Sequence, residues 1–347
     1  MALEYTDLDR RIWEEELDSF VPRRVFDVHA HVYQWKFNLD PAKEGGPLYE
    51  LLGKRFPDAG WADLDQCDDL LFPGRDVHRL AFPYPFSPVC DFDGANRFAA
   101  SEAKHDPLSA ALMLVHPSMS TEYLEARIRG AGFVGFKPYR FYSGANDAAS
   151  CRITDFLPER QIEVAHRLGL IIMLHLSKRE GIGDGENLAD LSRLTTKYPG
   201  AKWILAHCAR CYSARNIERA APRLRQLTNV WYDTSSVCES EAIEALMAGI
   251  GPDRVMYGSD DLPVGAARGK YIVFAHAWCC LSENNHAFDL SHCDPRMTFV
   301  RYEQLRATRR AALRLNLDRR QIENHFHDTA ARLIESARAA SSGSSVD

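Results

Sequence analysis

Short apolar runs alternate with longer amphipathic stretches along most of the chain from Val25 onward. The runs predict strands over residues 25–32, 79–86, 109–117, 133–140, 170–177, 202–208, 230–236 and 254–260. In the stretches between them, apolar residues recur at helical spacing. One such stretch begins at Thr154, whose side chain is typical of a helix N-terminus. Repeated strand–helix units of this kind indicate an α/β protein with a parallel sheet.

The number of predicted strands favours one arrangement. Eight parallel strands, each followed by a helix, predict a (β/α)₈ TIM barrel, and an open doubly wound sheet is the alternative. Two long segments do not fit the repeat, one between the first two strands and one after Asp260. Both follow the C-terminal end of a strand, where barrel enzymes build their active sites. We therefore expect long loop insertions after strands 1 and 8 that take part in the site.

The repeat leaves a segment at either end of the chain. We expect residues 1–24 to form a helix that flanks the barrel, and residues 25–339 to form a single domain. Residues 340–347 are small and polar, so we expect a disordered tail there.

The composition limits what the protein binds and where it works. Hydrophobic residues make up 46% of the chain and charged residues 26%, which is typical of a globular protein. The formal net charge of −6 gives no general attraction for nucleic acid or an anionic membrane. No apolar run reaches the roughly 18 residues of a membrane span, and the first residues do not resemble an export signal. We therefore expect a cytoplasmic protein that binds neither nucleic acid nor membranes.

The cysteines agree with this location. Nine of them are scattered through the chain, unlike the dense, even-numbered disulfide framework of small secreted proteins, so we expect reduced thiols. Cys208 and Cys211 form a C-x-x-C pair. Because no second pair follows at the spacing of a zinc ribbon, we expect a structural or incidental role for these two.

Titratable residues stand at the ends of most predicted strands. The first strand carries His29 and His31, whose spacing of two points both imidazoles to the same side. Further along the chain, the fifth, sixth and eighth strands end in His175, His207 and Asp260. The carboxyl ends of barrel strands meet at one face, and grouping such side chains there without a metal would be costly. The pattern therefore predicts a metal site.

The motifs that hold these residues resemble those of the amidohydrolase superfamily, within its amidohydrolase-related branch of single-domain metal-dependent barrels. The resemblance implies that one divalent ion is bound by His29, His31, His175 and Asp260, with Zn²⁺ favoured and Mn²⁺ or Fe²⁺ as alternatives. The carrying motifs, between residues 25 and 335, are DVHAH (27–31), GFVGFKPY (132–139), IIMLH (171–175), ILAHC (204–208), MYGSDDLP (256–263) and FHDTAARL (326–333).

The resemblance also implies roles for the catalytic residues. The metal would activate a water molecule, Asp260 would pass its proton to the leaving group, and His207 would polarise the substrate carbonyl or act as an acid or base. Lys137, at the end of the fourth predicted strand, leaves two arrangements open. In the one we favour, a single metal is bound and Lys137 pairs with a substrate carboxylate or with Asp260. In the other, Lys137 is carboxylated and bridges two ions.

The expected substrate follows from residues just beyond the strand ends. Arg140, Tyr142, Arg179 and Arg210 are candidate substrate-binding residues, and the guanidinium groups of the three arginines favour a small anionic substrate. The resemblance implies a metal-dependent hydrolase, and with these arginines we expect its substrate to be a carboxylate-bearing ester, lactone or amide. A nonoxidative decarboxylase or a hydratase on nearly the same ligands is the alternative, and a barrel without catalytic activity is a third interpretation. A homo-oligomer is compatible with all three.

Overall fold

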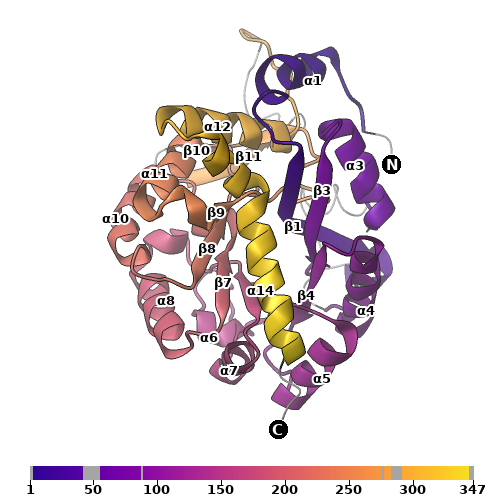
Figure 1. Ribbon diagram of the computed structural model, residues 1–347, viewed down its shortest axis with the longest axis vertical. Helices are drawn as coiled ribbons and strands as arrows, with labels where there is room; N and C mark the ends of the chain where they lie inside the picture. The colour runs from indigo at the N-terminus through magenta and orange to yellow at the C-terminus, as the bar shows by residue number, and fades with distance from the viewer. Residues whose placement is uncertain (1–2, 42–54, 87–88, 275–276, 283–290, 344–347) are drawn as a thin grey trace.

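The predicted strands come together in one sheet in the computed structural model, which describes residues 3–41, 55–86, 89–274, 277–282 and 291–343 (Figure 1). The strand order is β2-β1-β3-β4-β5-β6-β7-β8-β9, and every neighbouring pair is parallel except β1 and β2. The strands are β1 (Arg24–Gln34), β2 (Asp58–Ala59), β3 (Asp76–Pro83), β4 (Ala110–Val115), β5 (Gly135–Pro138), β6 (Ile171–Leu174), β7 (Lys202–Leu205), β8 (Val230–Asp233) and β9 (Val255–Met256).

Helices follow the strands and surround the sheet (Figure 1). The α-helices are α1 (Asp7–Ile12), α3 (Trp61–Leu71), α4 (Phe92–Glu102), α5 (Thr121–Ala131), α6 (Ile153–Phe156), α7 (Glu159–Arg167), α8 (Gly185–Lys197), α9 (Ala206–Arg210), α10 (Ala214–Leu224), α11 (Ser240–Ile250), α12 (Val300–Arg314), α13 (Arg319–Glu323) and α14 (Thr329–Gly343). Shorter helical turns are η1 (Trp13–Leu17), η2 (Trp35–Phe37), η5 (Ala103–His105), η6 (Arg140–Tyr142), η7 (Gly181–Gly183), η8 (Pro252–Arg254) and η9 (Asn324–Asp328).

The two ends of the sheet approach each other. Just beyond β9, the carbonyl of Tyr257 accepts a hydrogen bond from the amide of Val28 at 3.1 Å, and the amide of Asp260 donates to the carbonyl of His29 at 2.9 Å. A parallel bridge also pairs Ala30 with Asp261. The sheet is therefore curled, and this α/β fold is consistent with a TIM barrel.

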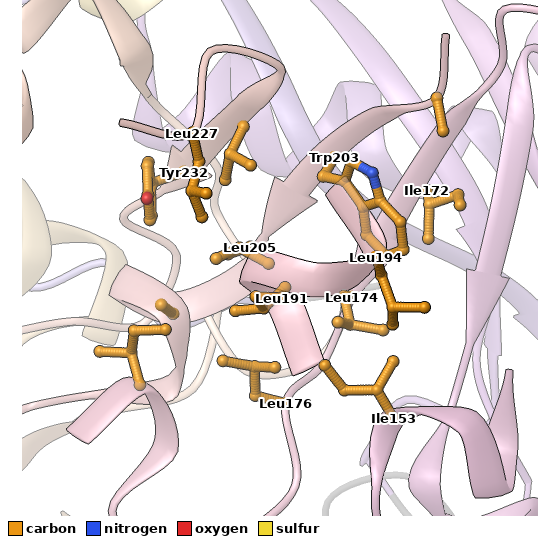
Figure 2. Close-up of a cluster of buried hydrophobic side chains, with 14 of the residues drawn as sticks. Ile153, Ile172, Leu174, Leu176, Leu191, Leu194, Trp203, Leu205, Leu227 and Tyr232 are labelled. Atoms are coloured by element: carbon orange, nitrogen blue, oxygen red, sulfur yellow. The ribbon is translucent and has the colours of Figure 1, made fainter. Parts of the chain in front are cut away.

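Alternate residues of the strands enter two different apolar layers. On β6, Ile172 and Leu174 face outward and pack with Leu191 and Leu194 of α8 and with Trp203 of β7 (Figure 2). Their neighbours along the strand belong to an inner cluster, which is made of Phe26, Val28, Leu80, Phe82, Ala110, Leu112, Val134, Ile171, Met173, Ile204, Met256, Ala330, Leu333, Ile334 and Ala337. This period of two explains why the parallel strands are apolar on both faces.

The long helix α14 contributes four of these inner residues, and it is the yellow helix that crosses the front of Figure 1. It extends to Gly343 and so includes the first residues of the segment for which the sequence predicts a disordered tail, and residues 344–347 lie outside the described part. At the other end of the chain, α1 and η1 lie against α12, where the rings of Trp13 and Tyr302 stack at 6.0 Å.

The two segments that interrupt the repeat contain structure of their own. After β1 come η2, β2 and α3, and residues 42–54 of this segment lie outside the described part. After β9 the chain forms the antiparallel hairpin of β10 (Gly269–Phe274) and β11 (Ala277–Ser282) before α12 begins. Within the described residues, no helix has the length and apolar character needed to span a membrane.

Several strands end earlier than the sequence predicts. The strands predicted over 202–208 and 254–260 stop at Leu205 and Met256. For β7 the reason lies in the backbone that follows, because His207 has a φ angle of 57° in the left-handed region and cannot continue a strand. Asp260, at the end of the second predicted strand, has a φ angle of 64°. Because the strands end early, the side chains of the following residues need not alternate between the two faces of the sheet.

Candidate metal centre

The candidate site begins with a break in the regularity of β1. The pairing of β1 with β3 shifts register between Asp27 and Ala30, and the Asp27 carboxylate accepts a hydrogen bond from the amide of His29 at 2.9 Å. Residues 26 and 28 face the inner cluster before the shift. After it, His29 and His31 lie against Phe82 of that cluster, with ring separations of 5.0 and 4.7 Å. The irregularity thus turns both histidines inward.

His29, His31 and Asp260 meet at the C-terminal ends of β1 and β9. The Nε2 atoms of both histidines lie 3.4 Å from Oδ1 of Asp260, and all three residues are buried. The other carboxylate oxygen, Oδ2, accepts a hydrogen bond from the Ser236 hydroxyl at 2.5 Å. Oδ1 is therefore the oxygen that faces the two imidazoles.

A second buried group of three contains His29, His207 and Asp233. Asp233 Oδ2 lies 3.0 Å from Nδ1 of His29, and its Oδ1 accepts from the amide of His207 at 2.9 Å. Nδ1 of His207 lies 2.9 Å from the carbonyl oxygen of Ser235, which can only accept. Both histidines therefore carry the proton on Nδ1 when they are neutral, and both keep a lone pair on Nε2.

Left-handed backbone recurs where the strands end at this site. His207, Cys208, Ala209 and Arg210 have φ angles between 50° and 59°, and Asp260 has 64°. Such conformations are unfavourable for residues other than glycine and persist when the surrounding structure holds them. Three of these positions, His207, Arg210 and Asp260, carry candidate site residues.

Burial sets the protonation of the site. It lowers the pKa of His29 to about 3 and also lowers that of His31, so both imidazoles are neutral near neutral pH. Burial alone would raise the pKa of Asp260, but His207, His31 and His29 together lower it below its ordinary value. Neutral imidazoles and an ionised carboxylate are the forms that bind a metal ion.

Lys137 reaches the same region from β5. Its ammonium lies 4.6 Å from the ring of Phe82 and 5.1 Å from that of Tyr139, and Nζ has no hydrogen-bond partner among the described residues. Burial lowers its pKa to about 7, although Asp233 and Asp260 raise it. The structure therefore places a buried, unpaired amine near the two carboxylates.

His175 lies beside this group rather than within it. Its ring is 5.2 Å from that of His207 and 6.0 Å from that of Tyr139, and it belongs to neither buried group of three. Its Nδ1 is buried without a hydrogen-bond partner among the described residues. His175 therefore has the free nitrogen that a ligand needs, and its assignment as the fourth ligand stays a prediction.

The predicted substrate-binding residues occupy different places. Arg140 and Arg210 are half-buried, and their charges, after burial and His207, lower the pKa of His175. Arg179 is exposed and lines a pocket together with Arg210. Tyr142 is buried, and its hydroxyl donates to the carbonyl of Phe86 at 2.7 Å, so this side chain contributes to packing.

An aromatic group near Arg210 was not anticipated from the sequence. The rings of Tyr212 and Trp278 stack at 4.4 Å, and Tyr271 lies 5.6 Å from Tyr212. The guanidinium of Arg210 lies 5.9 Å from the Trp278 ring. Two of these aromatic residues belong to the β10–β11 hairpin, and their separation from Arg210 along the chain left no local signal in the sequence.

The cysteines that form the C-x-x-C pair are both buried and free. Burial raises the pKa of the Cys211 thiol to about 11 and that of the Cys208 thiol well above its ordinary value. Thiols with raised pKa values are poor nucleophiles at neutral pH, which fits the structural or incidental role predicted for them.

The donor atoms of the site fit a divalent ion. Two atoms that each lie about 2.0–2.1 Å from a tetrahedral zinc ion are separated by about 3.4 Å. The Nε2 atoms of His29 and His31 stand at this distance from Oδ1 of Asp260. Asp233 orients His29 from behind, as carboxylates do for histidine ligands of zinc.

Three comparisons relate the chain to known proteins. A family model described as amidohydrolase matches residues 26–335, and no curated protein matches the chain. Among solved structures, 4-oxalomesaconate hydratase from Rhodopseudomonas palustris is 17% identical with a TM-score of 0.56, and the match covers 91% of this chain and 97% of that one.

Two further structures are similar at the same level. A putative 2-pyrone-4,6-dicarboxylic acid hydrolase from Pseudomonas putida is 18% identical with a TM-score of 0.52, covering 91% of this chain and 99% of that one. A 2,6-dihydroxybenzoate decarboxylase from Rhizobium is 14% identical with a TM-score of 0.55, with the same coverage. At these identities the likeness shows the fold. The family model spans nearly the whole curled sheet with its helices, and on this match the chain belongs to the amidohydrolase family of enzymes.

Proposed function

We propose that this chain is a metal-dependent hydrolase of a carboxylate-bearing ester, lactone or amide, built on a (β/α)₈ barrel. The observation that carries the proposal is the approach of two neutral imidazole Nε2 atoms to one ionised carboxylate oxygen, at 3.4 Å each, in a buried site at the strand ends. His29, His31 and Asp260 supply these atoms. A structural role alone does not account for such a group, because burying it without an ion is unfavourable.

The metal would be held by His29, His31 and Asp260, with His175 as the fourth ligand. Zn²⁺ suits this mixture of nitrogen and oxygen donors best, and Mn²⁺ or Fe²⁺ are alternatives. When bound, such an ion activates water near neutral pH and polarises a carbonyl group.

The residues of the chain would then move the proton. Asp260 is ionised and directs Oδ1 toward the two histidines, while Ser236 holds its other oxygen, so Oδ1 is placed to accept a proton from the attacking water and to return it to the leaving group. His207 presents an Nε2 lone pair because its Nδ1 donates to Ser235. It would act as the second acid or base, and it polarises a substrate carbonyl when it is protonated.

Arg140 and Arg210 would bind the substrate carboxylate. Burial, followed by the charge of Arg140, lowers the pKa of Arg210 to about 10, so the two cations stand near each other in a partly desolvated place. An anion between them would relieve this repulsion and accept paired hydrogen bonds. Arg179, in the pocket beside Arg210, would attract the anion from solvent. One of the similar structures is named for a dicarboxylic acid and another for a dihydroxybenzoate, both anions.

The metal content tests the first part of the proposal. Elemental analysis of wild type, His29→Ala, Lys137→Ala and the control His105→Ala, an exposed histidine, would be made on protein purified without added metal. We expect about one ion per wild-type chain, lost in His29→Ala and kept in the other two. Two ions, falling sharply in Lys137→Ala, would replace this arrangement with a carboxylated lysine bridge. The absence of any ion after metal is added back would overturn the proposal.

The products test the reaction. Carboxylate-bearing esters, lactones and amides would be incubated in ¹⁸O-labelled water, together with hydroxybenzoates as decarboxylase substrates. Hydrolysis predicts one labelled oxygen in the product and no carbon dioxide. Release of carbon dioxide would replace hydrolysis by nonoxidative decarboxylation, and addition of water across a double bond would replace it by hydration. For any substrate found, Arg210→Gln is expected to raise KM about 10- to 100-fold with a smaller effect on kcat.

A further inference from the structure

A buried network of charges lies directly behind the candidate metal centre. Arg301 of α12 is 1% exposed, and its guanidinium donates to the carboxylates of Asp261 and Asp68. Asp68 of α3 also accepts from Nη2 of Arg79 at 2.5 Å. The network therefore ties α3 and α12, which are far apart in the sequence, to the residue that follows Asp260.

Asp261 contacts the site through its backbone. Its carbonyl oxygen accepts a hydrogen bond from the amide of His31. Its own amide donates to the Ser259 hydroxyl at 2.9 Å. The residues on both sides of Asp260 are thus anchored, one by a side-chain hydroxyl and the other by an ion pair with Arg301.

The network continues to β1. The Asp27 carboxylate accepts from the amide of Ser259 at 2.8 Å and from the amide of His29 at 2.9 Å. It therefore joins the irregular part of β1 to the turn after β9. These two segments carry all three atoms that converge at the candidate site.

The backbone of Asp260 needs such support. Its φ of 64° is a left-handed conformation, which an isolated aspartate adopts only in a minor fraction of its states. Asp68 and Arg301 are both ionised near neutral pH. Burial alone would raise the pKa of Asp68, but Arg301 and Arg79 lower it below its ordinary value, and the pKa of Arg301 is raised by Asp68 despite its burial. Arg301 and Asp68 are therefore both charged in the network that holds Asp261.

We propose that Arg301 is a positioning residue for the metal centre, acting through its ion pair with Asp261. The pair fixes the backbone on the C-terminal side of Asp260, so that the Asp260 carboxylate stays opposite the Nε2 atoms of His29 and His31. Within the described residues, the side-chain hydrogen bonds of Arg301 go to Asp68, Cys67 and Asp261, and to none of these three side chains. This role rests on the proposed function, because it concerns the binding of the metal.

The test compares two buried arginines. Arg301→Met removes the ion pair and keeps much of the volume of the side chain. Arg268→Met is the matched control, because Arg268 is also buried and ion-paired, at 2.6 Å to Asp9 of α1, on the side of the N-terminal helix. For each metal-free variant the Kd for Zn²⁺, the absorption spectrum of the Co²⁺ form and the thermal midpoint would be measured. The Co²⁺ spectrum reports the coordination geometry without any substrate.

We expect Arg301→Met to bind Zn²⁺ about 10- to 100-fold more weakly than wild type and to have an altered Co²⁺ spectrum. Arg268→Met should lose thermal stability but keep the wild-type Kd within about twofold, together with the wild-type spectrum. Arg301→Lys, which keeps the charge, should recover part of the affinity. If Arg301→Met does not fold, Asp261→Asn gives the same test with a nearly identical shape.

Three results would overturn the role. The first is a Kd and a spectrum like those of wild type in folded Arg301→Met, or in Asp261→Asn where that variant replaces it. The second is an equal loss of affinity in Arg268→Met, which would mean that any loss of stability weakens the site. The third is a wild-type chain that binds no divalent ion, which would overturn the proposed function as well. In the first two results wild type still binds metal, so the proposed function stands.

Discussion

Nδ1 of His29 lies 3.0 Å from Oδ2 of Asp233, and this contact decides which nitrogen of His29 faces the site. An ionised carboxylate accepts only, so Nδ1 must donate and Nε2 keeps its lone pair. Burial alone would raise the pKa of Asp233, but His29 and His207 lower it well below its ordinary value. Asp233 is therefore a fixed acceptor that prepares His29 for an ion.

Replacing Asp233 by asparagine should weaken metal binding while leaving the shape of the side chain nearly unchanged. An amide oxygen is a weaker hydrogen-bond acceptor than a carboxylate. The Nε2 atom of His29 would therefore be less basic and a weaker metal ligand. We expect the Kd of Asp233→Asn for Zn²⁺ to rise about 10- to 100-fold, measured by competition with a chromophoric chelator.

Asp190→Asn is the matched control for this variant. Asp190 is also buried, and it lies on α8, away from the candidate ligands. Its Oδ1 forms an ion pair with Nη2 of Arg152 at 2.6 Å. Its substitution should lower stability and leave the Kd for Zn²⁺ within about twofold of wild type. Equal Kd values for Asp233→Asn and wild type would contradict the orienting role.

Gly258 is expected to be intolerant of a side chain. A Cβ atom added there would stand 2.8 Å from Cβ of His29 and 3.4 Å from that of Ser235. The backbone would have to shift at the site, so Gly258→Ala should lower the free energy of unfolding by about 1–3 kcal/mol and also weaken Zn²⁺ binding. Urea unfolding and a metal titration measure the two effects.

Gly130 offers the opposite expectation in the same experiment. It lies in α5, and an added Cβ meets nothing within 4 Å among the described residues. Gly130→Ala should therefore raise the free energy of unfolding by about 0.5–1 kcal/mol, because alanine has the higher helix propensity. Similar behaviour of the two alanine variants would contradict the close approach of Gly258 to His29.

The sequence predicted those features that depend on the residues of a single strand. The apolar runs predicted the parallel strands, and a polar residue at the end of a run marked His29, His31 and Asp260, which the structure brings together. The exact strand ends were not predictable, because left-handed backbone at His207 involves no glycine and leaves no trace in composition. Strands and the polar residues at their ends can therefore be predicted from a short stretch of sequence, whereas left-handed backbone at residues other than glycine cannot.

Contacts between distant segments were missed for a different reason. Arg301 meets Asp68 and Asp261 only after α3 and α12 pack around the end of the sheet. In sequence, Arg301 is one of several arginines on an amphipathic helix. His175 was marked correctly as a strand-end residue, but its distance from the His29 group depends on how far the sheet curls, and the spacing of residues along the chain does not contain that quantity.

Asp9 predicts how the protein responds to acid. Burial alone would raise its pKa, but hydrogen bonds from Arg268, Thr298 and Thr6 lower it below its ordinary value. A carboxyl group whose pKa is lower in the folded than in the unfolded state stabilises the fold above the unfolded value of about 3.9, and this contribution is lost as the pH falls below it.

The difference in free energy of unfolding between wild type and Asp9→Asn should therefore be constant from about pH 5 to 7 and shrink below about pH 4. Urea unfolding at a series of pH values measures this difference. A gap that stays the same down to pH 3 would mean that Asp9 contributes no charge-dependent stability.

Lys137 predicts a second pH dependence of the free energy of unfolding. Its cause is burial of an amine, whereas for Asp9 it is hydrogen bonding to a carboxylate. Burial lowers its pKa to about 7, whereas an unfolded chain has a lysine pKa of about 10.4. Between these values the unfolded state binds more protons at Lys137 than the folded state does. The free energy of unfolding of the metal-free protein should therefore rise with pH across this window, by at most about 1.4 kcal/mol per pH unit from this group.

Lys137→Met should remove this slope, and Lys104→Met, at an exposed lysine of η5, should keep it. Urea unfolding of the metal-free proteins at pH 7, 8 and 9 measures the three slopes. A wild-type slope equal to that of Lys137→Met would mean that folding of the metal-free chain does not lower the pKa of Lys137, and would contradict the burial of a free amine at this position.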